Sequence, residues 1–554
     1  GTKKENQNME KVKILKRCVS ACLAATVALG AAGCSGGGGT GSSKPAGGDA
    51  SAASAVTVSK SGKVSDTPVT FTMLYADNST YPFKQSWETL KKMKELTNVS
   101  LNVTVVPDAD YPTKVQLLLN SGDIPDIVCN GVSGSVEEMA LNGKLLCFSD
   151  YVKSMPNFQK LVKNCDLSAQ LENSELSDGK MYSLPVNVDE KRVQTEQWFV
   201  RKDLFDKNNL TIPTTWDECY KDMKILKAKY PKIIPIQNIY GTDDLLCMVG
   251  SSFGTVAGWD SANTGFMYDK SSDKWIHAPT SDNYKAMLQF LHKLYAEGIL
   301  DKEFVTLDTT TYDQRILKGQ TIMWDGWFVG EVSYNEDGKK TDSNFNVVPI
   351  PALAGPSGKA GTKVTGSWGH SMICPASVKD KEYFNTLIRW LDWMYSEDGA
   401  NLFSWGVKGV TYTENSDGTK AFTSNIISPT NPKGSKYLDR DYGCNNNNLS
   451  FVFPYDYLKA TFTKEDSAVL DEESQKNMLT DPQPSLRLTS DEKEEENLVS
   501  TALKDYVDAE KEKFIMGKES FNNWDAYVKE CDQKGRSKLS KLYNQVWQRQ
   551  KSAK

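Results

Sequence analysis

The feature that most constrains the fold is an alternation of strand-like and helix-like segments that begins near residue 69. Val69–Tyr75 and Leu101–Val106 have the apolar pattern of strands, and Phe83–Thr97 between them has partial helical periodicity. A second helical stretch, Tyr111–Asn120, leads to a short apolar strand at Asp126–Asn130. Strand–helix–strand units at this spacing predict parallel pairing with right-handed crossovers, and therefore an α/β fold.

The alternation returns after Pro185. A helix is expected to begin near Trp216, because Thr214 or Thr215 can cap it and the acidic pair at 217–218 would lie in its first turn, where the helix dipole favours negative charge. The other elements expected are strands at 233–236 and 321–324, helices at 284–297 and 382–403, and a mainly helical, highly charged tail from residue 467.

The chain is too long for a single core. It has 554 residues, and about 490 of them follow Pro68, whereas one hydrophobic core stops growing at roughly 250–300 residues. We therefore expect two or three domains in this part of the chain.

The N-terminal segment has the pattern of an export signal. Basic residues at 11–17 precede an apolar stretch from Cys18 to Ala32, about fifteen residues long and shorter than the roughly twenty that a spanning helix needs. Cys34 follows Gly33, and a cysteine at the cleavage point can carry acyl chains on its amino group and thiol. We interpret residues 1–33 as a lipoprotein signal peptide and Cys34 as the lipid attachment site; an ordinary secretory signal with a chance cysteine is the alternative.

Residues 34–65 are rich in Gly, Ser and Ala, with few bulky side chains. Such a segment cannot bury enough apolar surface to offset its ordering entropy, so we expect a flexible linker with a reach of about 30 Å. The protein would then lie on the extracellular face of a bacterial cell membrane, held there by lipid. No second apolar run is long enough to span a membrane.

Charge and composition exclude several classes of function. The net charge is −6, and removal of a signal with six basic and two acidic residues leaves the mature chain near −10. An acidic surface disfavours nucleic acid as a partner, because phosphate binding needs clustered Lys and Arg.

The chain has only three histidines, which makes a His-based metal site a poor hypothesis. The eight cysteines after Cys34 are widely spaced without a CxxC, which favours buried free thiols over disulfides.

Five short motifs occur in a fixed order along the chain. They are Gly122–Val128 (GDIPDIV), Gly143–Leu146 (GKLL), Asp178–Pro185 (DGKMYSLP), the pair Val200–Phe205 (VRKDLF) and Pro213–Glu218 (PTTWDE), and Leu317–Trp327 (LKGQTIMWDGW). Together they resemble the motifs of bacterial extracellular solute-binding proteins of family 1, the large carbohydrate-binding lipoproteins of ABC importers. The resemblance covers about Val69 to Trp405 and is poor in the tail.

This resemblance implies a two-lobe α/β fold of the type II periplasmic-binding-protein kind, with hinge crossings and a helical C-terminal extension. Lobe 1 would comprise 66–185 and 370–407, and lobe 2 would comprise 186–369 and 410–554, with crossings near Pro185, Ser367–Ile373 and Gly406–Val410. It further implies capture of an oligosaccharide between the lobes and its delivery to ABC permease subunits in the membrane. A binder of peptide or another small solute is the main alternative.

The chain departs from some members that it resembles, which carry a calcium loop after the TWDE helix. Here that place is Ala228–Ile233, which contains no carboxylate, whereas calcium needs several clustered oxygen ligands. We therefore expect no metal there and no cofactor elsewhere.

Sugar sites combine aromatic platforms with short polar side chains, and ligands of open α/β sheets lie beyond the carboxyl ends of strands. Two roles are possible for Tyr75, Trp368 and Trp405: they can stack on a sugar ring or pack in the core. Two roles are also possible for Asp77 and Asp325, which can contact the ligand or cap a helix. The other polar candidates can contact the ligand or have an ordinary role in a loop. The candidate ligand-binding residues are Tyr75, Asp77, Asn78, Asn130, Tyr240, Asp243, Asp325, Trp327, Trp368 and Trp405.

A lipid-anchored extracellular glycoside hydrolase is the rival class. It needs two carboxylates about 5–10 Å apart, and with 71 acidic residues the sequence cannot select a pair. Gly250–Gly254 matches Gly-x-Ser-x-Gly, but the residues that follow do not have a helical pattern, so the segment is expected to be a glycine-rich turn. We therefore expect a binding protein without catalytic residues.

Overall fold

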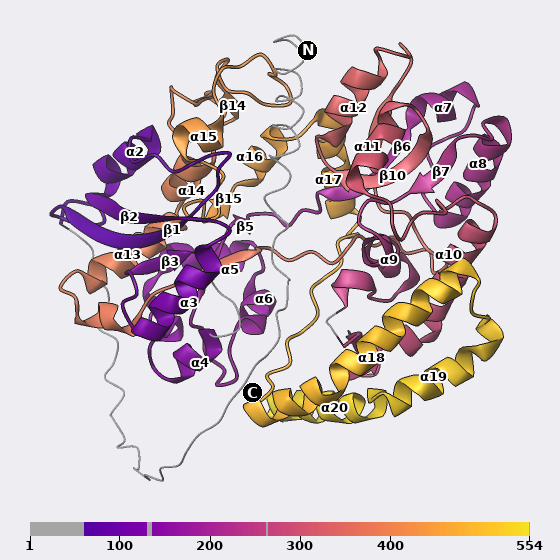
Figure 1. Ribbon diagram of the computed structural model, residues 1–554. Coiled ribbons are helices and arrows are strands. Elements are labelled where there is room, and N and C mark those ends of the chain that lie inside the picture. The colour runs from indigo at the N-terminus through magenta and orange to yellow at the C-terminus, as the bar shows by residue number, and fades with distance from the viewer. Residues whose placement is uncertain (1–59, 130–135, 262–263, 553–554) are drawn as a thin grey trace.

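The computed structural model describes residues 60–129, 136–261 and 264–552, which form two α/β lobes side by side (Figure 1). The signal segment, residues 34–59 of the expected linker with Cys34, and Asn130 lie outside the described residues. The end of the expected linker is part of lobe 1, because Val64 and Ser65 are buried and the Ser65 amide donates to the Thr97 carbonyl at 3.1 Å. No helix in the described ranges is both long and apolar enough to cross a membrane.

The sheet of lobe 1 has the strand order β2-β1-β3-β12-β4. β1 pairs in parallel with β2 and β3, as the strand–helix–strand pattern predicts, and the late strand β12 runs antiparallel between β3 and β4. The elements are β1 (Val69–Asp77), α2 (Glu88–Thr97), β2 (Val99–Pro107), α3 (Tyr111–Ser121), β3 (Ile127–Cys129), α4 (Val136–Leu141), α5 (Pro156–Asn164), α6 (Ser168–Asn173), β4 (Leu184–Val186) and β12 (His370–Ile373).

Lobe 2 has a second sheet with the order β11-β6-β10-β7. Thr215 begins helix α8 with a capping box: its hydroxyl accepts from the Glu218 amide at 3.1 Å, and the Glu218 carboxylate accepts from the Thr215 amide at 3.2 Å. The elements are β6 (Glu196–Arg201), α7 (Lys202–Lys207), α8 (Trp216–Lys229), β7 (Ile234–Gln237), α9 (Thr242–Gly250), α10 (Asp282–Ala296), α11 (Thr309–Leu317), β10 (Thr321–Trp327), α12 (Gly330–Gly338) and β11 (Val347–Ile350).

The helix expected at 382–403 is two helices. α13 (Phe384–Met394) ends before Ser396, whose hydroxyl accepts from the Gly399 amide at 3.2 Å and so begins α14 (Glu397–Ser404). The N-cap bond satisfies an amide at the start of α14 and allows the chain to turn there.

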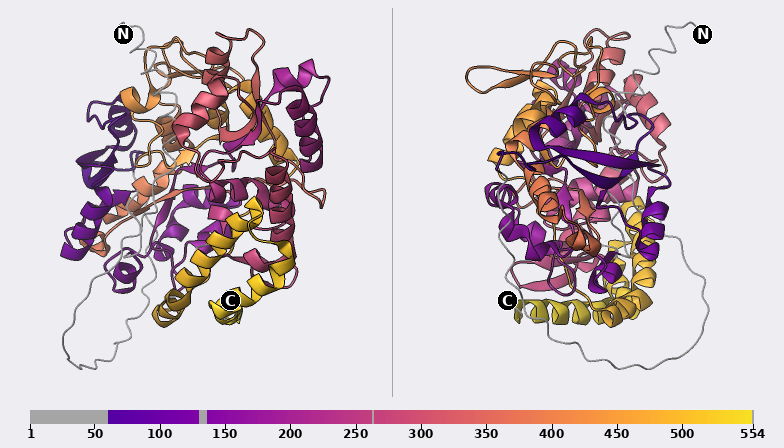
Figure 2. Two further views of the ribbon diagram at one scale, coloured as in Figure 1. Left: turned by 45° about the vertical axis from the view of Figure 1, so that its right-hand side comes forward. Right: turned by 90° about the vertical axis from the view of Figure 1, so that its left-hand side faces the viewer.

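The tail is helical, as expected, and belongs to lobe 2. Its long helix α18 (Ser490–Met516) places Leu503, Val507 and Phe514 in the same buried cluster as the residues of α8 and α10. α17 (Lys464–Gln475), α19 (Trp524–Gln533) and α20 (Arg536–Ser552) are the other helices of the tail. In Figures 1 and 2, α18–α20 form a layer along one edge of lobe 2.

The position of the third crossing is expected near Gly406–Val410. Residues beyond that point still contact lobe 1 or the first crossing: the Asn445 amide donates to the Phe403 carbonyl at 3.0 Å, and β15 (Val452–Phe453) pairs in parallel with β5 (Val188–Asp189). Contacts with lobe 2 begin just before α17, where Phe462 packs on Phe328 with ring centroids 5.4 Å apart, and continue in α17, where Gln197 Nε2 donates to Glu473 at 2.8 Å. We therefore propose that lobe 1 extends to about residue 460, with the crossing just before α17.

Asn448 attaches this later segment to β1. The Ala76 amide donates to Asn448 Oδ1, and Asn448 Nδ2 donates to the Ala76 carbonyl, both at 3.0 Å, and the asparagine is 2% exposed. Asn448→Ala leaves two buried backbone groups unpaired, so we expect the free energy of unfolding to fall by about 2–4 kcal/mol. Denaturant unfolding checks this, with Asn447→Ala from the same asparagine run as the control. Equal stability of the two variants would contradict this role of Asn448.

Candidate functional site

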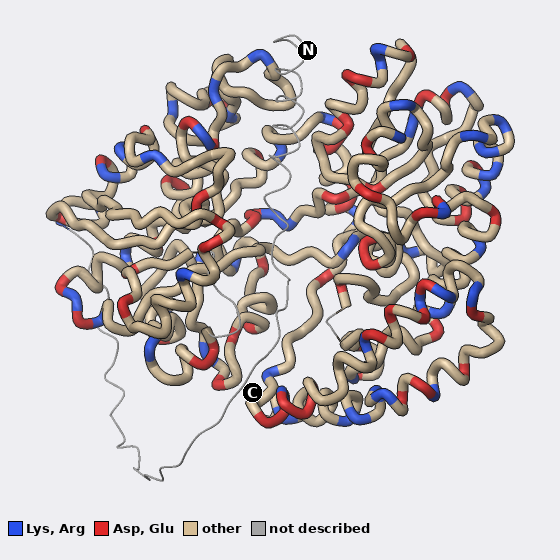
Figure 3. Tube along the Cα trace, viewed as in Figure 1, with Lys and Arg blue, Asp and Glu red and all other residues tan. Residues whose placement is uncertain are grey.

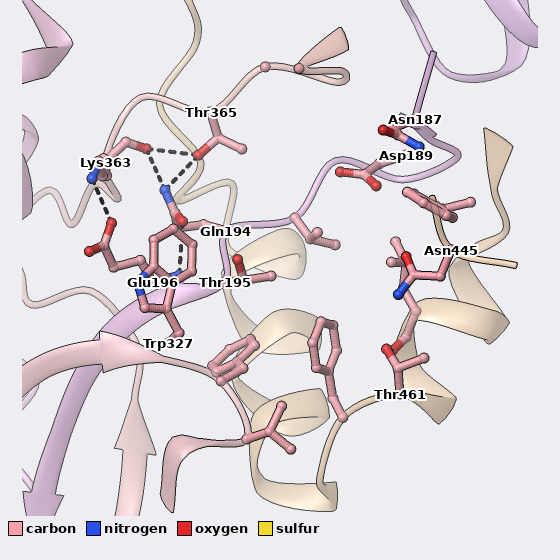
Figure 4. Close-up of a pocket in the computed structure, with 18 of the residues that line it drawn as sticks. Asn187, Asp189, Gln194, Thr195, Glu196, Trp327, Lys363, Thr365, Asn445 and Thr461 are labelled. Carbon is pink, nitrogen blue, oxygen red and sulfur yellow. Dashed lines mark hydrogen bonds and ion pairs between the residues drawn. The ribbon is translucent and has the colours of Figure 1, made fainter. Parts of the chain in front are cut away.

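A cleft of about 1960 Å³ lies between the two lobes. Its walls come from the first crossing (Asn187–Glu196), the second crossing (Lys363–His370), the end of β10 in lobe 2 and the loop around Asn445 in lobe 1 (Figure 4). Drug-sized pockets have volumes of about 300–1,000 Å³, so this cleft has room for a longer ligand of several rings.

Aromatic side chains provide flat surfaces in and beside the cleft. Trp259, Trp327 and Trp368 line it, and Trp259 is 48% exposed. Tyr240 lies beside Trp259, with ring centroids 6.3 Å apart. Gly258 precedes Trp259 with φ 57°, and a Cβ there would lie 1.8 Å from the Asp243 carbonyl oxygen, so glycine is required for the turn that presents the tryptophan.

Hydrogen bonds join the two crossings at the side of the cleft. Gln194 Nε2 donates to Thr365 Oγ1 at 2.9 Å, and Gln194 Oε1 accepts from the Glu196 amide at 3.0 Å (Figure 4). Lys363 Nζ, from the second crossing, contacts Glu196 Oε2 at 2.5 Å. The two crossing segments are therefore bonded to each other where they enter lobe 2.

A cluster of buried carboxyl groups lies next to Lys363. Glu196, Asp244 and Asp325 have oxygens within 4.8 Å of one another, and Lys363 Nζ is also 3.3 Å from Asp244 Oδ1. Burial and the charge of Asp244 raise the pKa of Glu196 to about 8, and the same two causes raise that of Asp325 well above its usual range. Burial opposes the charge of Lys363, but its carboxylate partners outweigh burial and raise its pKa.

The three carboxyl groups have the spacing of a metal site, and they are the only such group of three among the described residues. The Lys363 ammonium already lies within hydrogen-bond distance of two of them and supplies the positive charge that the cluster needs. We therefore assign the cluster as an ion-paired, partly protonated network.

Three of the ten candidate ligand-binding residues line the cleft: Asp243, Trp327 and Trp368. Tyr240 lies just beside it against Trp259. Asp243 is paired with Lys511 at 2.5 Å, so part of its role is structural.

Three other candidates are buried and cannot reach a ligand. Tyr75 is 1% exposed and packs on Phe83 in the core of lobe 1, because it shares a face of β1 with other core residues. Trp405 is fully buried against Phe422, with ring centroids 4.7 Å apart. Asp325 is also fully buried and accepts from the Ile239 amide at 3.1 Å.

The candidates after β1 organise their own loop. Asp77 Oδ1 accepts from the Phe83 amide at 2.7 Å, and Asn78 Oδ1 accepts from the Thr80 amide at 2.9 Å. Neither side chain is among those that line the cleft. Asn130 lies outside the described residues.

Sequence reasoning missed Gln194, Glu196, Trp259, Lys363 and Thr365. Gln194, Glu196, Lys363 and Thr365 lie on or next to the crossings. Because the motifs indicate roughly where the crossings are, the polar residues near them could have been chosen as candidates from the sequence. Trp259 follows the Gly-x-Ser-x-Gly segment at 250–254 and had no signal of this kind.

The Gly-x-Ser-x-Gly segment is not the plain turn that the sequence predicts: Gly250 ends α9, and Ser251–Phe253 form one turn of 3₁₀ helix before Gly254. Ser252 is 1% exposed, and its hydroxyl donates to the Leu353 carbonyl at 2.7 Å, so it is not a nucleophile.

The eight cysteines after Cys34 are free thiols, six of them buried, which confirms the preference for thiols over disulfides.

Comparison with known proteins gives a match to one family model. The model described as bacterial extracellular solute-binding protein matches residues 76–401. The chain is similar to the polygalacturonan/rhamnogalacturonan-binding protein YtcQ of Bacillus subtilis (strain 168), with 24% identity over 471 residues, 83% of this chain and 88% of YtcQ. It is also similar to the lipoprotein LipO of the same organism, with 28% identity over 346 residues, 60% of this chain and 65% of LipO.

Among solved structures, the chain resembles a solute-binding protein of Bifidobacterium longum infantis ATCC 15697, described as binding HMO and associated with an ABC transporter. The TM-score is 0.64 with 18% identity, covering 87% of this chain and 99% of that one. The likeness shows a periplasmic-binding-protein-like α/β fold, as the sequence resemblance implies.

The raised pKa of Glu196 predicts a pH dependence of stability. The folded protein holds this proton up to about pH 8, whereas the unfolded chain releases it near the ordinary glutamate pKa of about 4.3. The folded state therefore binds more protons in this window, and stability falls as pH rises, by at most about 1.4 kcal/mol per pH unit for one proton.

Glu196→Gln removes this titrating group. The free energy of unfolding of the original protein minus that of the variant should therefore decrease as the pH rises from about 5 to about 8. Denaturant unfolding of both proteins across that range measures the difference. Other raised carboxyl groups, such as Glu473 with a pKa of about 8, remain in both proteins and cancel. A difference that does not change with pH would contradict the assignment.

Proposed function

Because the chain belongs to the bacterial extracellular solute-binding proteins, we propose that it captures an oligosaccharide between its lobes and delivers it to the permease of an ABC importer. Its family is one of binding proteins, and the chain is not an enzyme. The observation that carries the proposal is the cleft, in which Trp259, Trp327 and Trp368 lie around polar crossing segments.

The chemistry of the cleft supports a sugar as the ligand. Sugar rings present flat C–H faces, which pack on indole rings, and hydroxyl groups, which pair with short polar side chains. Amide and hydroxyl side chains such as Gln194 and Thr365 line the cleft beside these rings. The similarity to YtcQ, named for binding polygalacturonan and rhamnogalacturonan, supports a saccharide as the ligand.

The mechanism that we propose is capture by closure. A ligand that contacts both lobes favours the closed form by its differential affinity for that form, and the permease then binds the closed form. The crossings at 187–195 and 363–369 connect the lobes and line the cleft, so ligand contact and lobe movement involve the same segments.

Trp259→Ala should lower the affinity for an oligosaccharide at least tenfold, a loss of about 1.4 kcal/mol or more, because a partly exposed stacking face is removed. The ligand for this test is the oligosaccharide that raises the melting temperature most in a panel of plant and microbial glycan fragments. Calorimetric titration then measures its affinity for the original protein and for the variant. Trp259→Phe should recover part of the affinity.

Tyr75→Phe is the matched control, since Tyr75 is buried in lobe 1 away from the cleft. Its affinity should stay within about twofold of the original protein. If the Trp259→Ala variant binds the oligosaccharide as tightly as this control, the proposal that the ligand binds in this cleft is wrong.

We propose that Cys34 carries the lipid that keeps the protein beside its permease. The similarity to the lipoprotein LipO supports an anchor, and the linker at 34–65 gives a reach of about 30 Å. Cys34→Ser should move the protein from the membrane fraction to the medium, measured by fractionation and immunoblotting of expressing cells. Continued membrane association of this variant would contradict the attachment site.

A further inference from the structure

We infer that the ligand is an uncharged oligosaccharide rather than a chain of uronic acids. The inference rests on the proposed function and deepens it by naming the charge class of the sugar. It comes from the charged groups of the cleft, which leave no strong site for a ligand carboxylate.

Five lysines and seven carboxyl side chains line the cleft, and no arginine is among the described residues that do so. Arginine is the side chain best suited to bind a carboxylate, because its fork makes two parallel hydrogen bonds. A uronate chain carries one negative charge per ring, so its site needs several unpaired cations.

The two buried lysines are already paired. Lys363 contacts Glu196 at 2.5 Å and Asp244 at 3.3 Å, and Lys511 contacts Asp243 at 2.5 Å and Asp508 at 2.6 Å. A ligand carboxylate that took the Lys363 ammonium would leave the buried Asp244 without its counter-charge, which is strongly unfavourable. One that took Lys511 would have to displace the existing pairs with the half-buried Asp243 and Asp508.

The lysines at the rim of the cleft also provide little positive charge for a ligand carboxylate. Lys504 pairs with Asp508, and Lys340 pairs with Asp337. Lys433 is exposed and has no carboxylate partner among the described residues, and a single exposed ammonium is a weak, salt-screened site. Figure 3 shows acidic and basic residues mixed along the segments between the lobes, without a block of positive charge.

Protonation does not make the cleft positive at neutral pH. Glu196 has a pKa of about 8 and is mainly uncharged at neutral pH, and burial raises the pKa of Asp189 well above its usual range. With neither of these two counted, the five other carboxyl groups that line the cleft still match the five lysines in number. The two histidines that line the cleft are also neutral, because burial lowers the pKa of His277 to about 3 and lowers that of His370.

The carboxyl groups without a lysine partner suit a neutral sugar. Asp189 and Glu336 line the cleft and have no ion pair among the described residues. A carboxyl group hydrogen-bonds to sugar hydroxyls in either protonation state, whereas an ionised carboxylate repels a ligand carboxylate. The cleft therefore favours hydroxyl-rich, uncharged rings.

Calorimetric titration of the full mature chain against oligosaccharides of matched length tests the inference. The neutral set contains fructan, xylan, mannan and galactan fragments and neutral milk oligosaccharides. The acidic set contains oligogalacturonate and oligoalginate. The fully methyl-esterified oligogalacturonate has the same rings and linkages as its acid, with a neutral methyl ester in place of each carboxylate. We expect at least one neutral member to bind at least tenfold more tightly than every acidic one.

An acidic oligosaccharide that binds most tightly would overturn this inference and leave the proposed function intact. Binding of no oligosaccharide would overturn the proposed function itself, and a short-peptide panel in the same titration identifies that case. The affinity for the best ligand should change less than about twofold between about 20 mM and about 500 mM NaCl, since no charge pair forms. A decrease above tenfold would count against an uncharged ligand.

Discussion

The ion pairs of Lys363 are the interaction on which the cleft depends. The lysine comes from the second crossing, Glu196 begins β6 after the first crossing, and Asp244 lies on α9, so one ammonium joins three separate segments. Without it, carboxyl groups within 4.8 Å of one another would be buried together without a counter-charge. The same contacts position the walls on which Trp259 and Trp327 lie, and they use up positive charge that a ligand could otherwise bind.

The cleft exists because each lobe has its own core. The buried cluster of lobe 1 includes Phe71 and Trp390, and that of lobe 2 includes Trp198 and Leu503, with the C-terminal helices packed onto it. The connections between the lobes are a few crossing segments, so the surfaces between them remain free to bind a ligand and to move. The tail therefore serves as structure for lobe 2, and most of its charged residues lie on the outside of α18–α20.

The rule that ligands lie beyond the carboxyl ends of strands selected both cleft and core residues. In lobe 2 it selected Trp327, which lines the cleft at the end of β10, and Asp325, which is fully buried. β1 ends in a loop whose Asp77 and Asn78 side chains are used by nearby backbone amides, and Tyr75 points into the core. The reason is that lobe 1 contributes to the cleft mainly through the crossings and through residues between Phe422 and Leu458, which no strand pattern identifies.

The sequence by itself determined the α/β class, the parallel order of the first strands, the capping of α8, the free thiols and the family, because these depend on local periodicity, short motifs and composition. Only the tertiary structure decided that α13 and α14 are separate and which tryptophans line the cleft, and only its contacts support the proposed extension of lobe 1 to about residue 460. It also decided the charge balance of the site. Glu196, Asp244, Lys363 and Lys511 are far apart in the chain, and whether a lysine is available to a ligand depends on which carboxylates folding brings within hydrogen-bond distance of it.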